Sequence, residues 1–247
     1  MINTTIIIPT KNEFSNLKLI LPIVNRINNC DILVIDNSSP DEKKKTEKIC
    51  KKLSIKMISQ LSSGKGNALR ESVKHTKNKY IIFFDADCSH NPSDIIRIVK
   101  LFNKFPWIDH IGGSRMTGGS DELYNDAGHF IRLFGSIIIN ILINFKFKSK
   151  LTDAQNGFRG LIREKFIKLN TKSIHTSIEM EMVALSLSNN LNYVEIPTHE
   201  WKRNFGESKI SIFKHSFSYV FTLIKILFFK KRNKKIIYLD EKYWHYF

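Results

Sequence analysis

Two carboxylates separated by one residue, Asp85 and Asp87, directly follow the apolar run YIIFF. The run predicts a buried strand, so both carboxylates are expected just beyond its carboxyl end, where they can reach one divalent cation. Hard oxygen ligands suit Mg²⁺ or Mn²⁺, and such a cation can bridge a substrate diphosphate. A triplet of this kind also arises by chance or caps a helix, but the preceding strand favours a metal site formed by Asp85 and Asp87.

A second acidic residue, Asp36, ends the apolar run DILVID and is followed by Asn37 in a polar turn. Both side chains can hydrogen-bond a base or a ribose there, although the segment could also be a plain turn in which Asp41 caps the next helix. Lys65 lies in the glycine-containing loop SSGKGN, which lacks the spacing of an ATPase phosphate loop. A flexible loop that brings Lys65 to a nucleotide remains consistent with the pattern.

Apolar runs and helical patterns alternate along the first 110 residues. Strands are expected at 4–8, 31–36, 55–58 and 80–84, and helices at 14–27, at 67–76 and after the polar turn NSSPDEKKK, where the helix ends at about Leu53. Strands that are apolar throughout are typical of a parallel sheet covered by helices on both faces. The polar residues gather just after these strands, at the edge where open α/β sheets bind ligands.

The pattern is less regular after about residue 110. A long apolar helix is expected at 128–147, and an apolar and basic helix at 212–229. Arg132 and Ser136 lie four residues apart on the first of these helices and therefore share a face. Neither helix is long and apolar enough to span a bilayer, but both suit a membrane surface. A shorter helix at 178–189 and a strand at 193–197 lie between them.

The segments IIIPTKNE, DNSSPD, SSGKGNAL and FFDADCSH occur in this order and resemble the family 2 glycosyltransferases. The resemblance implies an α/β protein with the GT-A fold, which has three α/β/α layers around a mostly parallel central sheet, here followed by C-terminal amphipathic helices. GSRMTGG, DAQNGFRGLIR, EMEM, VEIP and KRNFGESKI are similar to the branch of dolichol-phosphate mannose synthases and other polyprenyl-phosphate sugar synthases. The resemblance covers roughly residues 4–215.

This resemblance implies an inverting, metal-dependent transferase that uses Mg²⁺ or Mn²⁺. It would move a sugar from GDP-mannose or a UDP-hexose to a polyprenyl (dolichyl) phosphate. The family often has an Asp where this chain has Asn37, so the base of the donor stays open. An acceptor phosphate is already anionic and needs little or no general base, whereas a hydroxyl acceptor does.

The resemblance also implies roles for individual residues. Donor-binding residues are Pro9, Asn12, Glu13, Asp36, Asn37, Lys65, Asp85, Ala86 and Asp87, of which Asp85 and Asp87 would also bind the metal. Catalytic candidates are Asp87, Asp153 and Glu181, with Glu179 nearby as a second choice to Glu181. Candidates for the acceptor phosphate are Arg115, Arg132, Ser136, Arg203 and Lys209. Each cation could instead be a solvated surface charge, and Asn156-Gly157 could be only a turn.

The net charge of +16 favours anionic partners such as lipid headgroups or phosphorylated substrates, although surface lysines that merely solvate the protein explain it equally well. We expect a GT-A domain at 1–211 and, at 212–247, an apolar and basic helix with a basic tail. The predicted location is peripheral, on the cytoplasmic face of a membrane, because no signal segment is evident. Cys30, Cys50 and Cys88 form no metal-ligand spacing and indicate free thiols.

Three other functions are less consistent with the sequence. A transferase of the same fold that acts on a saccharide hydroxyl would not need the two apolar helices. A nucleotidyltransferase would carry a glycine- and arginine-rich loop where this chain has PTKNE. A nucleic-acid-binding protein would show a recognition motif, or aromatic residues interleaved with Lys and Arg, and neither pattern occurs.

Overall fold

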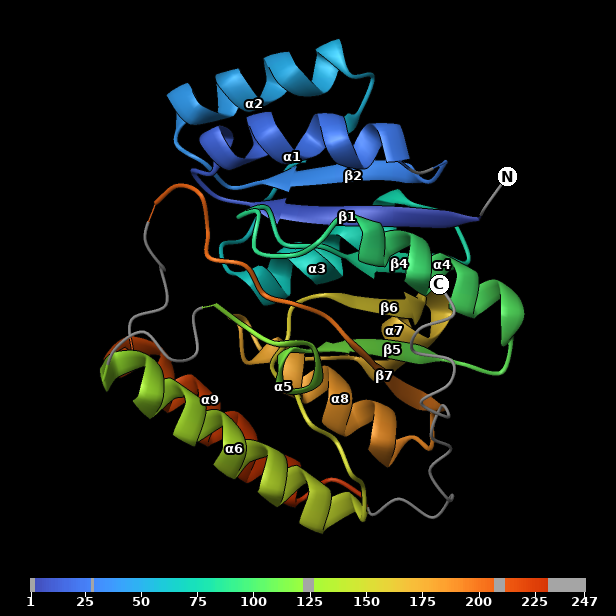
Figure 1. Ribbon diagram of the computed structural model, residues 1–247, viewed down its shortest axis with the longest axis vertical. Coiled ribbons are helices and arrows are strands. Elements are labelled where there is room, and N and C mark those ends of the chain that lie inside the picture. Colours follow the sequence, from blue (N-terminus) through green and yellow to red (C-terminus); the bar gives the residue numbers. More distant parts are fainter. Residues whose placement is uncertain (1–2, 28, 122–126, 207–211, 231–247) are drawn as a thin grey trace.

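The computed structural model describes residues 3–27, 29–121, 127–206 and 212–230 (Figure 1). A seven-stranded sheet runs through the centre of the described part in the order β3-β2-β1-β4-β6-β5-β7. Only β6 is antiparallel to its neighbours; the other pairings are parallel. The strands are β1 (Thr4–Thr10), β2 (Asp31–Asp36), β3 (Lys56–Ser59), β4 (Tyr80–Phe83), β5 (His110–Ser114), β6 (Arg159–Ile162) and β7 (Tyr193–Pro197).

Helices cover both faces of this sheet, as expected for strands that are apolar on both sides. The helices are α1 (Phe14–Ile27), α2 (Pro40–Lys52), α3 (Lys65–Ser72) with the 3-10 turn η1 (Val73–His75), α4 (Ser93–Lys104), α5 (Arg115–Gly118), α6 (Ala127–Phe147), α7 (Arg163–Leu169), α8 (Ile178–Ser188) and α9 (Ile212–Leu227). Side chains of α1, α2 and α4 fill the core on one face. Side chains of α3, α7 and α8 fill the core on the other, which gives the three predicted layers.

A third apolar cluster lies beyond the second helical layer. Ile139, Ile143 and Phe147 of α6 and Ile226 of α9 pack there against α8. In Figure 1 α6 and α9 lie side by side at the lower left, and both contact α8. α9 thus shares a core with α6 and α8, while the domain boundary at residue 211 stays a prediction. Residues 231–247, which include most of the predicted basic tail, lie outside the described residues.

The antiparallel strand β6 determines what meets at the carboxyl edge of the sheet. Its first residue, Arg159, pairs with Phe83 at the end of β4 and with Gly112 near the end of β5. The residues that precede Arg159 therefore lie beside the segment that follows β4. Arg115, which directly follows β5, comes to the same edge. One reversed strand thus joins three segments that are far apart in the sequence.

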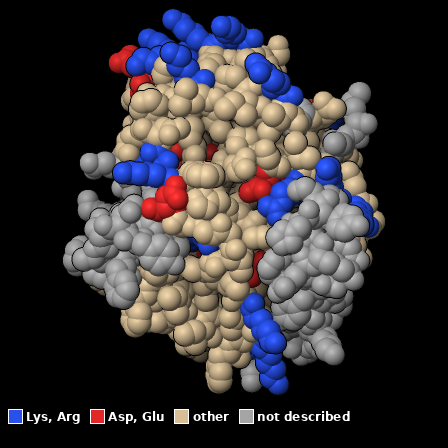
Figure 2. All heavy atoms as spheres, in the orientation of Figure 1, with Lys and Arg blue, Asp and Glu red and all other residues tan. Residues whose placement is uncertain are grey.

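Two features of the surface bear on the predicted membrane association. No helix in the described residues is long and apolar enough to cross a bilayer. Figure 2 shows Lys and Arg side chains gathered along the edge that α2 forms, at the opposite end of the molecule from α6 and α9 (Figure 1). That part of the basic surplus therefore does not lie next to the apolar helices.

Candidate active site

The ends of the parallel strands β2, β1 and β4 bring the predicted donor residues to one edge. Thr10 pairs with Asp36, and Ile7 pairs with Phe83, so the segments after these strands start near one another. Asp36 is buried, and its Oδ1 accepts a hydrogen bond from the backbone N–H of Ser38. Its Oδ2 is also buried and has no hydrogen-bond partner in the described structure. A buried acceptor of this kind suits a hydroxyl or N–H donor of a ligand.

The loop after β1 is joined to the loop after β2 by a reciprocal contact. Asn12 has a positive φ of 53°, which turns its backbone toward the second loop. Its N–H donates to Oγ of Ser38 at 2.7 Å, and its Oδ1 accepts from the N–H of Ser39 at 2.8 Å. Asn37 donates its backbone N–H to the Thr10 carbonyl at 3.0 Å. The predicted donor residues of the first two strands are thus one connected unit.

Three more predicted donor residues flank this unit. Pro9 lies in β1, paired with Ile35. Glu13 begins the turn into α1, where its Oε2 accepts a hydrogen bond from the Asn16 amide at 2.7 Å. Ala86 is buried between Asp85 and Asp87. Ala86 therefore has a packing role that leaves its two neighbours at the surface of the site.

Lys65, at the start of α3, joins Asp85 to Glu179 of α8. Its Nζ lies 2.5 Å from Oδ1 of Asp85 and 2.6 Å from Oε1 of Glu179. Burial alone would lower the pKa of Lys65, but the two carboxylates outweigh this and raise that pKa. Burial would raise the pKa of Asp85, yet Lys65 and His90 lower it overall. The pKa of Glu179 is raised because its burial is only partly offset by Lys65.

Asp87 has a different cation. Its Oδ2 lies 2.8 Å from NH2 of Arg203, while its Oδ1 accepts from the hydroxyl of Ser89 at 2.6 Å. Arg203 was predicted to bind the acceptor phosphate, and the structure places it against the second residue of the predicted metal pair. The two carboxylates of that pair are therefore held by cations from two distant segments, Lys65 and Arg203.

Gly157 allows the segment before β6 to approach this group. A Cβ built at position 157 would overlap Oδ2 of Asp85 and come within 2.8 Å of Nζ of Lys65. Only a residue without a side chain leaves room for that ion pair. The Asn156-Gly157 pair is thus part of the site wall, whereas the sequence allowed that it was only a turn.

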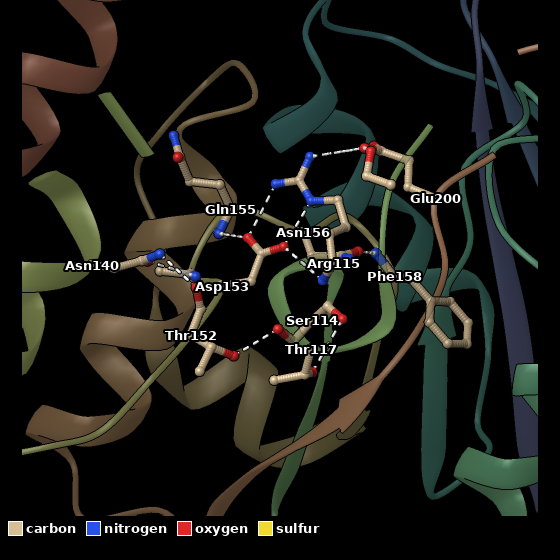
Figure 3. Close-up of polar contacts among 12 residues, drawn as sticks. Ser114, Arg115, Thr117, Asn140, Thr152, Asp153, Gln155, Asn156, Phe158 and Glu200 are labelled. Atoms are coloured by element: carbon tan, nitrogen blue, oxygen red, sulfur yellow. Dashed lines mark hydrogen bonds and ion pairs between the residues drawn. The ribbon is translucent and has the colours of Figure 1, made fainter. Parts of the chain in front are cut away.

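Arg115 and Asp153 form a second charged group, shown in Figure 3. Nε and NH2 of Arg115 donate to the two oxygens of Asp153 at 2.7 and 3.0 Å, and the backbone N–H of Arg115 donates at 3.1 Å. NH1 of Arg115 lies 3.2 Å from Oε1 of Glu200. Burial would raise the pKa of Asp153, but Arg115 outweighs it and lowers that pKa.

Exposure separates the roles of these two residues. The side chain of Asp153 is fully buried, whereas that of Arg115 is 17% exposed. Asp153 therefore cannot contact a substrate without rearrangement, and it acts on the site by holding the guanidinium. Sequence reasoning proposed Asp153 as catalytic and did not identify Glu200, whose carboxylate also accepts from Ser120 at 2.7 Å.

Glu181 binds a loop of the backbone. Its carboxylate accepts the backbone N–H groups of Lys172 and Ser173 at 2.8–3.0 Å and so holds that loop. Glu179 is the acidic residue of α8 that faces the site, through Lys65. The two lie two residues apart, which on a helix turns them in different directions.

The remaining acceptor candidates belong to α6 and to the segment before α9. Ser136 is buried in α6, and its Oγ has no hydrogen-bond partner in the described structure. The backbone of Arg132 lies in α6, but its side chain is outside the described residues, as is the whole of Lys209. Their predicted contact with a phosphate stays a prediction.

A divalent cation fits this edge through Asp85 and Asp87. Both side chains are about one-fifth exposed, and both offer hard oxygen donors. The described residues contain no group of three or more Asp, Glu, His or Cys side chains that could enclose a metal. Two carboxylates with open positions suit Mg²⁺ or Mn²⁺ bound together with a diphosphate, rather than a closed structural site.

Comparisons of the sequence with known proteins give matches over most of the chain. The model of the family described as glycosyl transferase family 2 matches residues 5–169. The glycosyltransferase AglJ of Haloferax volcanii is 25% identical over 202 residues, which cover 81% of this chain and 64% of AglJ. An uncharacterized protein of Methanocaldococcus jannaschii is 29% identical over 227 residues, covering 87% of this chain and 90% of that protein.

A solved structure is similar over most of the chain. Glucosyl-3-phosphoglycerate synthase from Mycobacterium tuberculosis, crystallised with Mn²⁺, UDP and phosphoglyceric acid, gives a TM-score of 0.71 at 13% identity. The match covers 92% of this chain and 79% of that one. The same enzyme was also crystallised with Mg²⁺ and UDP. The likeness confirms the predicted fold.

Proposed function

The chain belongs to glycosyltransferase family 2, and from this premise we propose that it moves a sugar from a nucleotide diphosphate to a polyprenyl phosphate at a membrane surface. One observation carries the proposal. The Arg115 guanidinium lies at the same sheet edge as Asp85 and Asp87, and its partner loop is held by α6, a helix whose outer face is apolar and exposed.

On the donor side, Asp36 and the Asn12 loop would hold the nucleoside, and Asp85 and Asp87 would hold the cation. When bound, the cation neutralises charge that develops on the leaving diphosphate. Complexes of the mycobacterial enzyme with UDP-glucose and Mn²⁺ support a donor and metal of this class. Asn37 leaves the identity of the base open.

On the acceptor side, Arg115 has the geometry to bind a phosphate. A guanidinium carries five N–H groups, and the contacts to Asp153 and Glu200 engage Nε, NH1 and NH2. NH2 makes one of these contacts and carries two N–H groups, so its second N–H remains for a phosphate oxygen. Burial would lower the pKa of Arg115, but Asp153 and Glu200 outweigh it and raise that pKa, so the cation stays charged.

The outer faces of α6 and α9 support a lipid-borne acceptor. Large apolar side chains there are 40–86% exposed. We call them the apolar surface; its members are Phe134, Ile137, Ile138, Ile141, Phe145, Phe217, Val220, Phe221, Ile224, Leu227 and Phe228. Contiguous exposed apolar side chains mark an interaction site, and amphipathic helices of this kind lie in a bilayer interface. A polyprenyl phosphate presents its charge at the same level.

A saccharide hydroxyl is the second candidate acceptor, and Glu179 favours it. Transfer to a hydroxyl needs a general base, and Glu179 is a buried carboxylate of raised pKa beside Asp85. In the lipid-phosphate reaction Glu179 would instead hold Lys65 in place. The two acceptors thus predict different consequences of Glu179→Gln: severe loss with a hydroxyl, modest loss with a phosphate.

The deciding experiment incubates the protein with UDP- and GDP-sugars, Mg²⁺ or Mn²⁺, and one acceptor at a time. The acceptors are a polyprenyl phosphate in liposomes, free oligosaccharides and phosphoglyceric acid. We expect lipid-linked sugar from the first acceptor and binding of the protein to anionic liposomes at low salt. Product on an oligosaccharide or phosphoglyceric acid, with none on the lipid, would replace this proposal by a soluble acceptor.

A further inference from the structure

The side-chain amide of Asn140, in α6, binds the backbone on both sides of Asp153. Its Nδ2 donates to the carbonyl of Thr152 at 2.6 Å, and its Oδ1 accepts from the N–H of Ala154 at 3.0 Å (Figure 3). Asn140 is only 7% exposed, so water competes little for these bonds. The peptide groups on either side of Asp153 are therefore attached to α6 by one side chain.

The sheet holds the same loop from the other side. Glu195 of β7 accepts from the N–H and hydroxyl of Thr152 at 2.8 and 2.9 Å and from the N–H of Asp153 at 3.1 Å. With the Asn140 bonds, these contacts satisfy three consecutive backbone N–H groups, at residues 152–154. β7 is part of the central sheet, whereas α6 is an outer helix. The position of Asp153 is consequently set by one core element and one peripheral element.

The position of Asp153 in turn determines the position of the Arg115 side chain. Three hydrogen bonds of 2.7–3.1 Å join the two residues, so a shift of the carboxylate moves the guanidinium with it. Productive geometry at a site tolerates displacements of only about 0.5 Å. Loss of the two Asn140 hydrogen bonds would therefore displace Arg115 without removing any group that can contact a substrate.

The helix that carries Asn140 has two distinct faces. Ile137 and Ile141, three residues before and one residue after Asn140, belong to the apolar surface, while the side chain of Asn140 points inward. One turn later Asn144 bonds the same loop at its start, through Leu151 and Ser149. One face of α6 thus carries exposed apolar side chains, and the opposite face carries the two asparagines that bind the Asp153 loop.

We propose that Asn140 is a positioning residue, which sets Arg115 through Asp153 and so couples the seating of α6 to acceptor binding. The coupling to a membrane rests on the proposed function, but the positioning of Arg115 holds for any anionic acceptor. Asn144 binds the start of the loop, at Ser149 and Leu151, and has no hydrogen bond to the residues that flank Asp153.

The test compares Asn140→Ala with Asn144→Ala, a matched control that removes an equally placed asparagine from the same helix and loop. We expect Asn140→Ala to raise the KM for a polyprenyl phosphate in liposomes by roughly tenfold, the scale of lost hydrogen bonds to a charged site, with the donor KM within about twofold. Asn144→Ala should lower the thermal midpoint similarly and leave the acceptor KM within about twofold. Equal effects of the two variants on the acceptor KM would overturn the proposal.

Asn140→Asp adds a readout that a purely structural role would not move. A carboxylate would face the Thr152 carbonyl repulsively, but a neutral acid can donate to that carbonyl and accept from Ala154, as the amide does. Glu195 and Asp153 favour the neutral acid, whereas Arg115 and Arg159 oppose it. The acceptor KM of Asn140→Asp, divided by that of the wild type, should therefore fall as the pH is lowered. The same ratio for Asn140→Ala should not change with pH. A flat ratio for both variants would contradict the proposal.

Hydrogen exchange separates this inference from the identity of the acceptor. Asn140→Ala should speed exchange of the backbone amides at 152–155 and leave those at 36–39 unchanged, whatever acceptor the enzyme uses. If the wild type transfers to phosphoglyceric acid, the proposed lipid acceptor fails, and the KM comparison is made with that anionic acceptor instead. Unchanged exchange at 152–155 would overturn the positioning role in either case.

Discussion

The two charged groups of the site hold their carboxylates in opposite ways. Asp85 and Asp87 are about one-fifth exposed, and each is paired with a cation from another element, Lys65 and Arg203. Asp153 is fully buried and is surrounded by donors from its own loop and from Arg115. The first arrangement lets a carboxylate exchange its partner for a metal ion. The second makes the carboxylate a fixed support and leaves the cation as the group that meets the substrate.

The sharpest way to break this comparison is to remove a carboxylate from the exposed group. Asp87→Ala should lower transfer at least about 100-fold, the scale of a lost electrostatic group at a reacting centre, because the cation on the leaving diphosphate loses a ligand. Activity is measured at saturating Mn²⁺, and thermal melting checks that the variant is folded. Full activity of the wild type in EDTA would remove the metal from the mechanism.

Removing the cation from each group should separate their stabilities. Arg115→Ala leaves the buried Asp153 without its partner and should cost about 3–5 kcal/mol of unfolding free energy. Arg203→Ala leaves a partly exposed Asp87 and should cost about 1 kcal/mol or less. Urea unfolding measures both values. The double variant Arg115→Met/Asp153→Leu should regain only part of this stability and none of the acceptor binding, because the lone buried charge is gone but the backbone N–H groups of Arg115 and Gln155 lose their acceptor.

A smaller effect is expected at the nucleotide end of the exposed group. Asp36→Ala should raise the donor KM roughly tenfold and leave the acceptor KM unchanged, since its buried oxygens face the donor loops and not Arg115. Steady-state kinetics with each substrate varied in turn measures both constants. A shift of the acceptor KM alone would place Asp36 outside the donor site.

The smallest effect concerns the buried group and pH. The pKa of Asp153 is lowered in the folded protein, so its ionised form contributes stability above the unfolded value of about 3.9, and this contribution is lost as the pH falls below it. The wild type should therefore be more stable than Asp153→Asn near neutral pH, and the difference should shrink on acidification below about pH 4. Urea midpoints at several pH values test the sign. A difference that grows with acidity would mean that Asp153 is not held as a carboxylate.

The regular part of the fold could be predicted because its periodicities are local. The helices α1 and α6 begin and end within one residue of the predicted ranges 14–27 and 128–147, and the strands β2 and β7 match their predicted ranges. β5 and β6 were not predicted, because HIGGS and RGLI are short and carry glycine or a charge. Arg159 is fully buried at the start of β6, which hydrophobic periodicity does not anticipate.

The sequence by itself determined the family, the layered fold, and which carboxylates follow apolar strands. These features depend on residues that are close together in the sequence. Only the tertiary structure decided which charges meet. It paired Arg203 with Asp87 and Arg115 with Asp153 and Glu200, it turned Glu179 rather than Glu181 toward Asp85, and it placed Asn140 across the Asp153 loop. These contacts depend on the reversed strand β6 and on the packing of α6 against α8. Ion pairs between distant segments give no periodic pattern in the sequence, because each partner occurs there as a single charged residue.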